Sequence, residues 1–523
     1  MVVTPNSKIR LLKSSIELDE RNQLTFANLT AQTNYFLSLT YLEEDDATYV
    51  RKDNVIRFPT DPTGTTYEDL LQYNYCMYQN TAYDSKWFYA FITGIKYIND
   101  GMSEITIETD VIETWKFDIV YKSSFIEREH TNDDTRGANL VPENLETGEY
   151  ISQFITNYGL GTSHVVMATN VDPSDGTTPV SGGTYGNIYS GVSYYVFQTE
   201  NDINVAIRKM AESGKVDAIS SLFYCPDFIT GYSTASFTNG IASVSSSQGT
   251  MTSISVPLAP STIDGYTPKN NKLFTYPYVA FVLSNNSGGS MTYHLEDFKD
   301  NSTHLGEIKV RGTCTPGASI RAIPVNYRCQ PTTLTDTDNN EYGLTMGKYP
   351  VCSYPADVYT NWVTQQGINP YMNMLESSIG GIASGSPLSV GTNLLASTYN
   401  AIHEVNLHNL VPYEARGNIN SGDITYTLGN LGYTGYLQTI KSQFARIIDD
   451  FFSMYGYKTN RLKVPNIEGR TNWNYVKTID INITGNIPQE DMQKIKDIFN
   501  NGITFWHNPT TFLDYSQSNT IVS

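Results

Sequence analysis

The chain has 523 residues, 40% of them hydrophobic, and a formal net charge of −19 at pH 7. This apolar content is enough for several packed domains and excludes a disordered chain. The excess of acidic over basic residues excludes a protein that binds nucleic acid by neutralising its phosphates over the whole surface. The 38 tyrosines and 38 glycines favour strands and turns, and tyrosine is also favoured at subunit contacts.

The first predicted element in chain order is a β-hairpin at residues 86–115. KWFYAFITGIKYI is an apolar-rich strand, NDG is a tight turn, and SEITIETDVIETW alternates between polar and apolar residues. Glu104, Glu108 and Asp110 share one face of the second strand, and Ile105 lies on the other. We therefore expect one face in the core and one face that is acidic and solvated.

The middle of the chain, residues 150–350, is rich in Gly, Ser, Thr, Asn and Tyr. Short apolar runs such as YPYVAFVLS and SGVSYYVFQ alternate with turn clusters such as SNNSGG, which predicts sandwich or barrel domains. The sequence does not predict the order of their strands. One helix is predicted in ENDINVAIRKMAESG.

Residues 377–402, between Glu376 and Glu404, contain no charged residue. Their glycines and serines are compatible with a flexible linker. The apolar side chains interleaved with these small residues favour a second interpretation, an apolar hairpin that packs against its copies in an oligomer. These side chains are Ile379, Ile382, Leu388, Val390, Leu394, Leu395 and Ile402.

Two amphipathic helices are predicted near the end of the chain. The first has an apolar face made of Ile440, Phe444, Ile447, Ile448, Phe451 and Tyr455. The second accepts Pro488 in its first turn, carries Met492, Ile495 and Phe499 on one stripe, and ends before Gly502. Strands in DITYTL, YKTNRLKV, WNYVKTIDINIT and GITFWH flank the helices, so the predicted order is β-α-β-β-α-β in a compact α+β module.

Catalytic and metal-binding patterns are nearly absent. His403 and His408 are five residues apart and would point away from each other on a helix, which favours surface histidines over a zinc pair. DTDNNE starts like a calcium loop, but Glu341 replaces the turn glycine. Glu108 and Asp110 have a spacing that a glycosidase could use, yet acidic residues are common on a solvated hairpin face. We therefore predict no enzyme, no catalytic residue, no metal and no cofactor.

The pattern of cysteines and the lack of a signal-peptide pattern both indicate synthesis in a reducing cytoplasm. The five cysteines are odd in number, far apart and without a Cys-x-x-Cys motif, which indicates free thiols made in a reducing compartment. The first twenty residues lack the apolar core and small-residue cleavage site of a signal peptide.

Several long strings resemble one known family. SKWFYAFITGIKY, IETDVIETWKFDI and SSFIEREH resemble the N-terminal part of the tail-knob, or distal tail tube, proteins of small Gram-positive-infecting short-tailed phages (Picovirinae-type podoviruses). FFSMYGYKTNRLKVPN, WNYVKTIDINITG and DIFNNGITFWH resemble the C-terminal part. The strings keep the family's order and cover about a third of the chain, and they are more specific than a short motif.

The resemblance implies a multi-domain, β-rich α+β fold. Tube domains built as β-barrels or sandwiches would occupy residues 1–150 and 412–523, the latter with the β-α-β-β-α-β-like module. A β-rich central knob region would occupy residues 151–360, and the uncharged loop would occupy residues 361–411.

The resemblance also implies a role in the tail of the virion, after synthesis in the host cytoplasm. Six copies would form a tube that contacts other tail and collar proteins. Genome DNA would pass through it without sequence-specific binding, along an acidic lining for which Glu104, Glu108 and Asp110 are candidates. The apolar loop would plug the tube and engage the host membrane, although here it is shorter and more polar than the family's loop. The alternative is a tail protein that binds or degrades a receptor or cell-wall glycan through its Tyr-rich central region.

Overall fold

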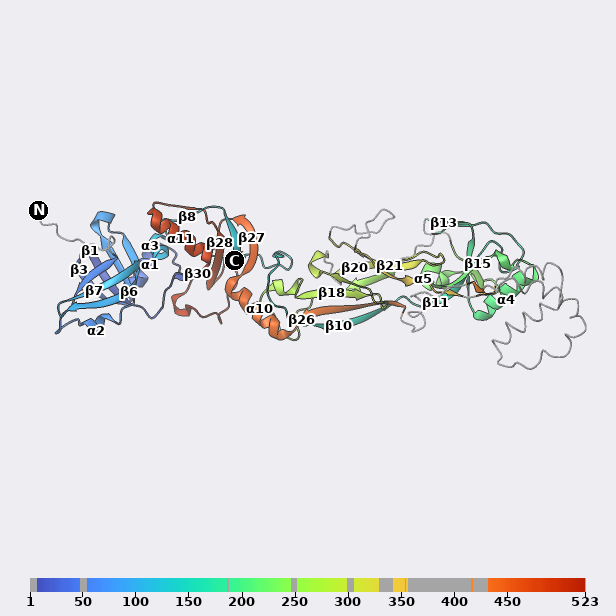
Figure 1. Cartoon of the computed structure of the whole chain (residues 1–523), viewed down its shortest axis with the longest axis horizontal. Helices are drawn as coiled ribbons and strands as arrows, with labels where there is room; N and C mark the ends of the chain where they lie inside the picture. Colours follow the sequence, from blue (N-terminus) through green and yellow to red (C-terminus); the bar gives the residue numbers. More distant parts are fainter. Residues whose placement is uncertain are drawn as a thin grey trace, which may run out of the picture. The chain divides into compact units, whose positions relative to one another are not determined.

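The computed structural model describes residues 7–47, 54–185, 188–245, 252–298, 305–328, 342–352, 354–355, 415–416 and 431–522 (Figure 1). The chain divides into two compact units. Unit 1 combines Met1–Gly148, Gly265–Thr275 and Lys441–Ser523, and unit 2 combines Glu149–Asp264 and Tyr276–Ile440.

Unit 1 contains a six-stranded antiparallel sheet formed by the N-terminal part of the chain. Its strands, in spatial order, are β3 (Thr40–Ala47), β1 (Ser7–Lys13), β5 (Tyr75–Asn80), β6 (Trp87–Asn99), β7 (Met102–Thr109) and β4 (Val55–Pro59). The predicted hairpin is confirmed as β6 and β7, with Asn99 opposite Met102 across the turn. Ile105 and Ile107 are buried, as expected for the apolar face of an alternating strand.

A second sheet of unit 1 interleaves strands from the two ends of the chain. Its order is β2 (Asn22–Leu24), β30 (Ile503–Trp506), β28 (Trp473–Ile479), β9 (Ser124–Glu129) and β27 (Tyr457–Lys463), and β8 (Val120–Tyr121) pairs separately with β29 (Ile483–Thr484). The α-helices in the described part of unit 1 are α1 (Leu29–Ser38), α2 (Tyr67–Leu70), α3 (Val111–Trp115), α10 (Ser442–Tyr455) and α11 (Gln489–Asn501). Ile107 and Ile112 share one buried cluster with Ile495 and Phe499, so the N-terminal and C-terminal parts fold around a common core.

Both C-terminal helices predicted from the sequence are present. Helix α11 follows Pro488 and is capped by Gly502, which confirms the second prediction. The first prediction was wrong at its start. Ile440 is the last residue of strand β26, and helix α10 begins only at Ser442. Its predicted apolar face is also shifted: Ile447 is 60% exposed, whereas Ala445, Ile448, Asp449 and Phe452 are buried.

From its first helix onward the predicted β-α-β-β-α-β order is present, but the strand that precedes this helix belongs to another unit. The strand expected at residues 423–428 lies outside the described residues. The strand that precedes α10 is β26 (Gly432–Ile440), and it pairs within unit 2.

In its described residues, unit 2 contains three larger sheets. The first has the order β10 (Tyr150–Gly159), β26, β18 (Val279–Ser284) and β19 (Ser290–Tyr293). The second has the order β16 (Ile241–Ser243), β14 (Ser193–Phe197), β11 (Ser163–Thr169), β15 (Ile219–Pro226) and β23 (Val351–Cys352). The third has the order β17 (Thr252–Val256), β20 (Gly306–Arg311), β21 (Ser319–Val325) and β22 (Leu344–Lys348). Two short pairs are β12 (Gly183–Tyr185) with β13 (Ile188–Ser190) and β24 (Tyr354–Pro355) with β25 (Ala415–Arg416).

Within the described residues, the α-helices of unit 2 are α4 (Glu200–Glu212) and the single turn α5 (Asp227–Thr230). Helix α4 confirms the helix predicted in the middle of the chain. Thr199 and Asp202 form a capping box at its N-terminus. Ala206 and Met210 pack against buried residues of the second sheet of unit 2.

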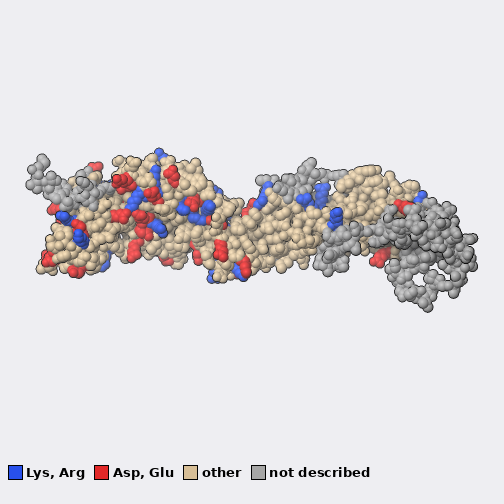
Figure 2. Space-filling model, in the orientation of Figure 1, with Lys and Arg blue, Asp and Glu red and all other residues tan. Residues whose placement is uncertain are grey.

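Charge is distributed unevenly between the units. Most of the charged residues of the chain belong to unit 1. The face drawn in Figure 2 accordingly shows red and blue atoms gathered over unit 1, while unit 2 is mainly tan. The strands β10, β26, β18 and β19 contain no charged residue at all. No helix within the described ranges is long and apolar enough to cross a membrane.

Candidate functional site

Glu104 and Glu108 lie on β7, where the sequence placed them. Glu108 is on the solvated side, with its side chain 54% exposed and its carboxylate 2.5 Å from Lys494 Nζ. Glu104 is half-buried and lies directly opposite Arg57 of β4 and Lys96 of β6. The acidic face of the hairpin is thus real, but basic residues neighbour both of its carboxylates.

Asp110 does not belong to this acidic face, and the prediction that it is solvated was wrong. Strand β7 ends at Thr109, and Asp110 caps the N-terminus of α3 with a side chain that accepts from the backbone N–H of Glu113 at 3.1 Å. Asp110 is only 2% exposed. The alternation of the strand stops where the cap begins, because an N-cap carboxylate turns toward the first helical turn and not across the sheet.

Asp110 instead belongs to a buried cluster of polar side chains. Its Oδ2 accepts hydrogen bonds from the Tyr75 hydroxyl at 2.9 Å and from Gln23 Nε2 at 3.2 Å. Burial raises its pKa to about 6, although these hydrogen bonds oppose the shift.

Glu113 and Lys116 complete this cluster on α3 and at its end. Burial raises the pKa of Glu113 to about 7, while the nearby Lys116 lowers it in part. Burial lowers the pKa of Lys116 to about 8, and its Nζ donates to the Leu24 carbonyl at 2.8 Å. Gln32 Nε2 donates to Glu113 Oε2 at 2.6 Å. Asp110 and Glu113, two carboxyl groups with raised pKa values, therefore lie at the N-cap and in the first turn of the same helix. This helix packs in the core that the N-terminal and C-terminal parts of the chain share.

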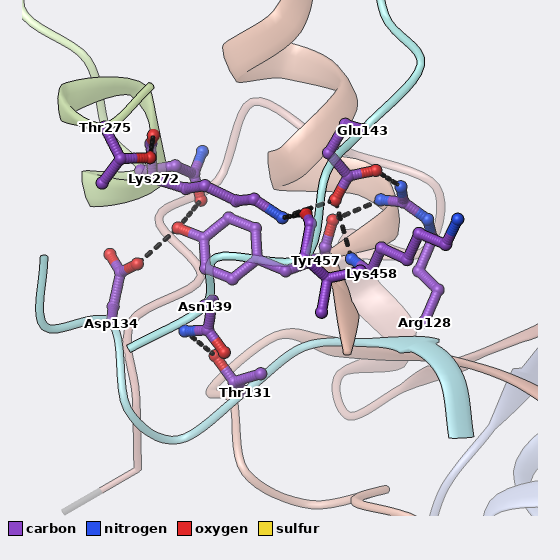
Figure 3. A network of polar contacts seen from close by, with 12 residues as sticks. Arg128, Thr131, Asp134, Asn139, Glu143, Lys272, Thr275, Tyr457 and Lys458 are labelled. Atoms are coloured by element: carbon purple, nitrogen blue, oxygen red, sulfur yellow. Dashed lines mark hydrogen bonds and ion pairs between the residues drawn. The ribbon is translucent and has the colours of Figure 1, made fainter. Parts of the chain in front are cut away.

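The second polar cluster of unit 1 surrounds the segment Gly265–Thr275, which the chain reaches from unit 2 and leaves again into unit 2. Figure 3 shows its centre. The buried Glu143 forms ion pairs with Lys272, at 2.7 Å, and with Arg128, and it accepts from the Lys458 backbone N–H at 2.8 Å. Burial lowers the pKa of Lys272, and its pairing with Glu143 opposes that shift.

Asp449 on α10 is the main anchor of the same segment. It is completely buried and accepts from the Tyr266 hydroxyl at 2.7 Å, from the Lys269 N–H at 2.8 Å and from the Asn270 N–H at 3.0 Å. Tyr457 donates to Asp134, as Figure 3 also shows. These contacts hold the segment Gly265–Thr275 within unit 1.

Sequence reasoning missed both clusters. Asp449 carried a usable signal, because it falls between Ile448 and Phe452 on the buried face of a helix, where a carboxylate needs partners. Glu143 and Lys272 carried none, because they lie 129 positions apart in segments without periodicity.

The remaining predicted sites lie outside the described residues. They are the seven apolar side chains of the loop (Ile379, Ile382, Leu388, Val390, Leu394, Leu395 and Ile402), the pair His403 and His408, and the DTDNNE turn. Within the described part of the chain, no group of three or more His, Cys, Asp or Glu side chains could hold a metal ion.

Comparisons with known proteins agree over most of the chain. The family model for the C-terminal domain of the tail knob protein gp9 of Bacillus phage phi29 matches residues 241–520, and the model for the N-terminus of caudoviral major tail proteins matches residues 5–122. Tail knob protein gp9 of Bacillus phage B103 is 27% identical, over 84% of this chain and 86% of the relative. Its counterpart in phage phi29 is 25% identical, over the same shares of the two chains.

A solved structure shows the same fold. The tail knob protein gp12 of bacteriophage C1 superposes with a TM-score of 0.62 at 15% identity, covering 99% of this chain and 100% of that one. The chain is therefore a β-rich structural protein of the phage virion, located in the tail, and not an enzyme. It belongs to the family of tail knob proteins typified by gp9 of Bacillus phage phi29, whose model spans more than half of it.

Proposed function

We propose that six copies of the chain form a ring at the distal end of a short tail and that this ring is the conduit through which the genome leaves the particle. The observation that carries the proposal is membership of the tail knob family, together with the match of residues 5–122 to major tail proteins. The net charge of −19 supports it, because walls of the same sign as DNA repel phosphates at short range and keep the duplex from adhering.

In this proposal residues 1–150 and 412–523 supply the tube domains and residues 151–360 the outer knob. Glu104 and Glu108 are the proposed acidic lining, and Asp110 is excluded because it is buried. The lining would be moderate in strength, since Arg57, Lys96 and Lys494 lie beside these two carboxylates.

Residues 361–411 are the proposed plug. An uncharged run with apolar side chains between small residues can pack closely against its copies in a closed ring. Two extended arms of thirteen residues would each reach about 43 Å, enough for a hydrocarbon core of about 30 Å, whereas two helical arms of that length would reach only about 20 Å. Membrane engagement is therefore proposed only for the oligomer, whose closed ring of hairpins would pair its own backbone groups.

The test compares two variants in assembled particles. One lacks residues 377–402, and the other keeps the length of the segment but replaces its seven apolar residues by serine. If the segment is a plug, both variants lose DNA retention and both fail to release dye from liposomes at neutral or acidic pH. Full DNA retention and infectivity in both variants would show that the segment is a linker, and an intact protein that never permeabilises liposomes would remove the membrane role.

A second candidate function is adhesion to cell-wall glycan through unit 2. Tyr276 favours it, because its ring is held by stacking on His294 at 4.0 Å while the residue is 49% exposed, which leaves an amphipathic aromatic side chain available to a ligand. Incubation with purified host wall separates the two functions. Retention of the protein on the wall that Tyr276→Ala abolishes would support adhesion, and the conduit alone predicts no retention.

A further inference from the structure

A group of aromatic and charged side chains lies at the surface of unit 2, where three segments of the chain meet. Tyr276 precedes β18, His294 and Asp297 lie in the turn after β19, and Arg328 follows β21. The Tyr276 and His294 rings stack in parallel, with 4.0 Å between their centroids and 9° between their planes. Tyr276 is nevertheless 49% exposed, so the stacked pair is accessible from solvent.

Hydrogen bonds hold Arg328 against this pair. Its Nε donates to Asp297 Oδ2 at 2.6 Å, and its Nη2 donates to His294 Nδ1 at 2.9 Å. Its backbone N–H donates to the Asp297 carbonyl at 3.1 Å, and its φ of +47° is one that L-residues rarely adopt. The guanidinium, on a side chain that is 37% exposed, is therefore fixed in place before any ligand arrives.

The contact with Arg328 also decides which nitrogen of His294 carries the hydrogen. A guanidinium can only donate, so Nδ1 is the acceptor and Nε2 is the N–H donor. Burial, and next the charge of Arg328, lower the pKa of His294, so the ring is neutral at pH 7. The group thus combines an aromatic surface, an imidazole N–H and the carboxylate of Asp297, whose side chain is 21% exposed.

The charges of this group disfavour an anionic ligand. Glu296 and Asp297 supply two carboxylates against the single guanidinium of Arg328, and the neutral His294 adds no charge. The Glu296 side chain is only 3% exposed, and its carboxylate accepts from the Tyr276 N–H at 3.1 Å. A phosphate or carboxylate bound beside Tyr276 would therefore meet a net negative surrounding, whereas a neutral molecule with hydroxyl groups would not.

We propose that Tyr276, His294, Asp297 and Arg328 form a subsite for one pyranose ring of a neutral saccharide. The C–H face of the sugar stacks on Tyr276, and its hydroxyl groups donate to the Asp297 carboxylate and accept from the N–H groups of His294 and Arg328. An apolar surface with a few fixed polar groups is the usual composition of a small-ligand site. The inference rests on the second candidate function, adhesion to wall glycan, and adds the class of sugar and the residues that bind it.

The first experiment titrates the purified full chain with a neutral N-acetylglucosamine trisaccharide and follows binding by saturation-transfer NMR. The wild type should bind, Tyr276→Ala should bind about tenfold more weakly or worse, and Tyr276→Phe, which keeps the stacking face, should bind like the wild type. Tyr189→Ala is the matched control, because Tyr189 on β13 of unit 2 is 77% exposed. Absent binding by the wild type, or equal binding by the wild type and Tyr276→Ala, would overturn the proposal.

The second experiment separates this inference from adhesion itself and uses the wild type, so it decides even if Tyr276→Ala fails to fold. Protein retained on purified host wall is challenged with the trisaccharide or with polyglycerol phosphate, an anionic polymer. Release by the trisaccharide alone supports the subsite, and release by the anionic polymer alone would overturn it while adhesion stands. A chain that binds the trisaccharide but is not retained on the wall would support the subsite and remove adhesion.

Discussion

At the residue scale, Asp449 is the clearest example of a buried carboxylate that its partners stabilise. Asp449→Ala would leave the Tyr266 hydroxyl and the backbone N–H groups of Lys269 and Asn270 without an acceptor. We expect the free energy of unfolding to fall by about 3–5 kcal/mol, and by less in Asp449→Asn, whose amide oxygen can still accept. Urea unfolding followed by tryptophan fluorescence measures this, because Trp87, Trp115, Trp473 and Trp506 all lie in unit 1. Equal stability of the alanine and asparagine variants would contradict the anchoring role.

Glu113 gives a prediction about pH. Its pKa is raised to about 7 in the folded chain, so between about pH 4.5 and pH 7 the folded state holds a proton that the unfolded state has released. The stability that Glu113 contributes is therefore present below this window and is lost as the pH rises through it. Glu113→Gln removes this dependence, and it should exceed the wild type by about 1–3 kcal/mol at pH 7.5 while matching it near pH 4.5.

The same comparison controls for other titrating groups. Asp110 adds a slope of the same sign, and His130, whose pKa burial lowers to about 3, adds one of the opposite sign, but both remain in the variant. Unfolding curves recorded at several pH values give the difference directly. Two stability profiles that stay parallel from pH 4.5 to pH 7.5 would show that Glu113 ionises normally.

At the element scale, the passage from α10 to β27 depends on one glycine. Gly456 ends the helix at a φ of +64°, and a Cβ there would lie 2.1 Å from the Glu129 carbonyl of β9. We expect Gly456→Ala to lower the free energy of unfolding of unit 1 by about 2–4 kcal/mol, from the left-handed backbone and the clash together. Gly64→Ala is the control, since its Cβ would make only an ordinary contact at 3.5 Å. A loss of the same size in both variants would mean that the α10 junction is not specially constrained.

The elements that the sequence predicted well are those whose pattern is local. The β6–β7 hairpin, α4 and α11 each carry a periodic apolar stripe with a turn, cap or glycine at the boundary. The prediction for Asp110 was wrong because the alternation of polar and apolar residues in the sequence continues through this position. The strand nevertheless ends at Thr109, because the Asp110 carboxylate accepts a hydrogen bond from the Glu113 backbone and caps a helix.

Other features depend on contacts that no local pattern records. The pairing of β26 with β10 and β18, the interleaving of β2 and β9 with the C-terminal strands, and the ion pair between Glu143 and Lys272 join segments more than a hundred residues apart. Ile440 was assigned to a helix because its apolar side chain fits both periodicities at the point where a strand meets a helix.

At the scale of the whole molecule, the proposed acidic lining predicts how charge reversal affects genome release. Particles that carry Glu104→Lys and Glu108→Lys should release DNA more slowly at low salt, because the two substitutions reverse the charge of the proposed lining. Glu104→Lys faces Arg57 and Lys96, so the variant protein is first checked for wild-type assembly into particles. The effect should shrink as salt is added. Glu17→Lys with Glu68→Lys, at two other exposed positions, changes the net charge equally and is the control. Equal release rates in the two double variants would remove the lining while leaving the conduit.

The central claim is that the chain forms a closed ring around the path of the genome, and an averaged electron image of the tail tip viewed along its axis tests it most directly. Particles imaged before and after ejection are the appropriate pair. The proposal predicts a six-fold ring of density from this chain, with a channel that is blocked before ejection and wide enough for a DNA duplex afterwards. Separate copies attached to the outside of another protein's tube, or a ring without a passage after ejection, would contradict it.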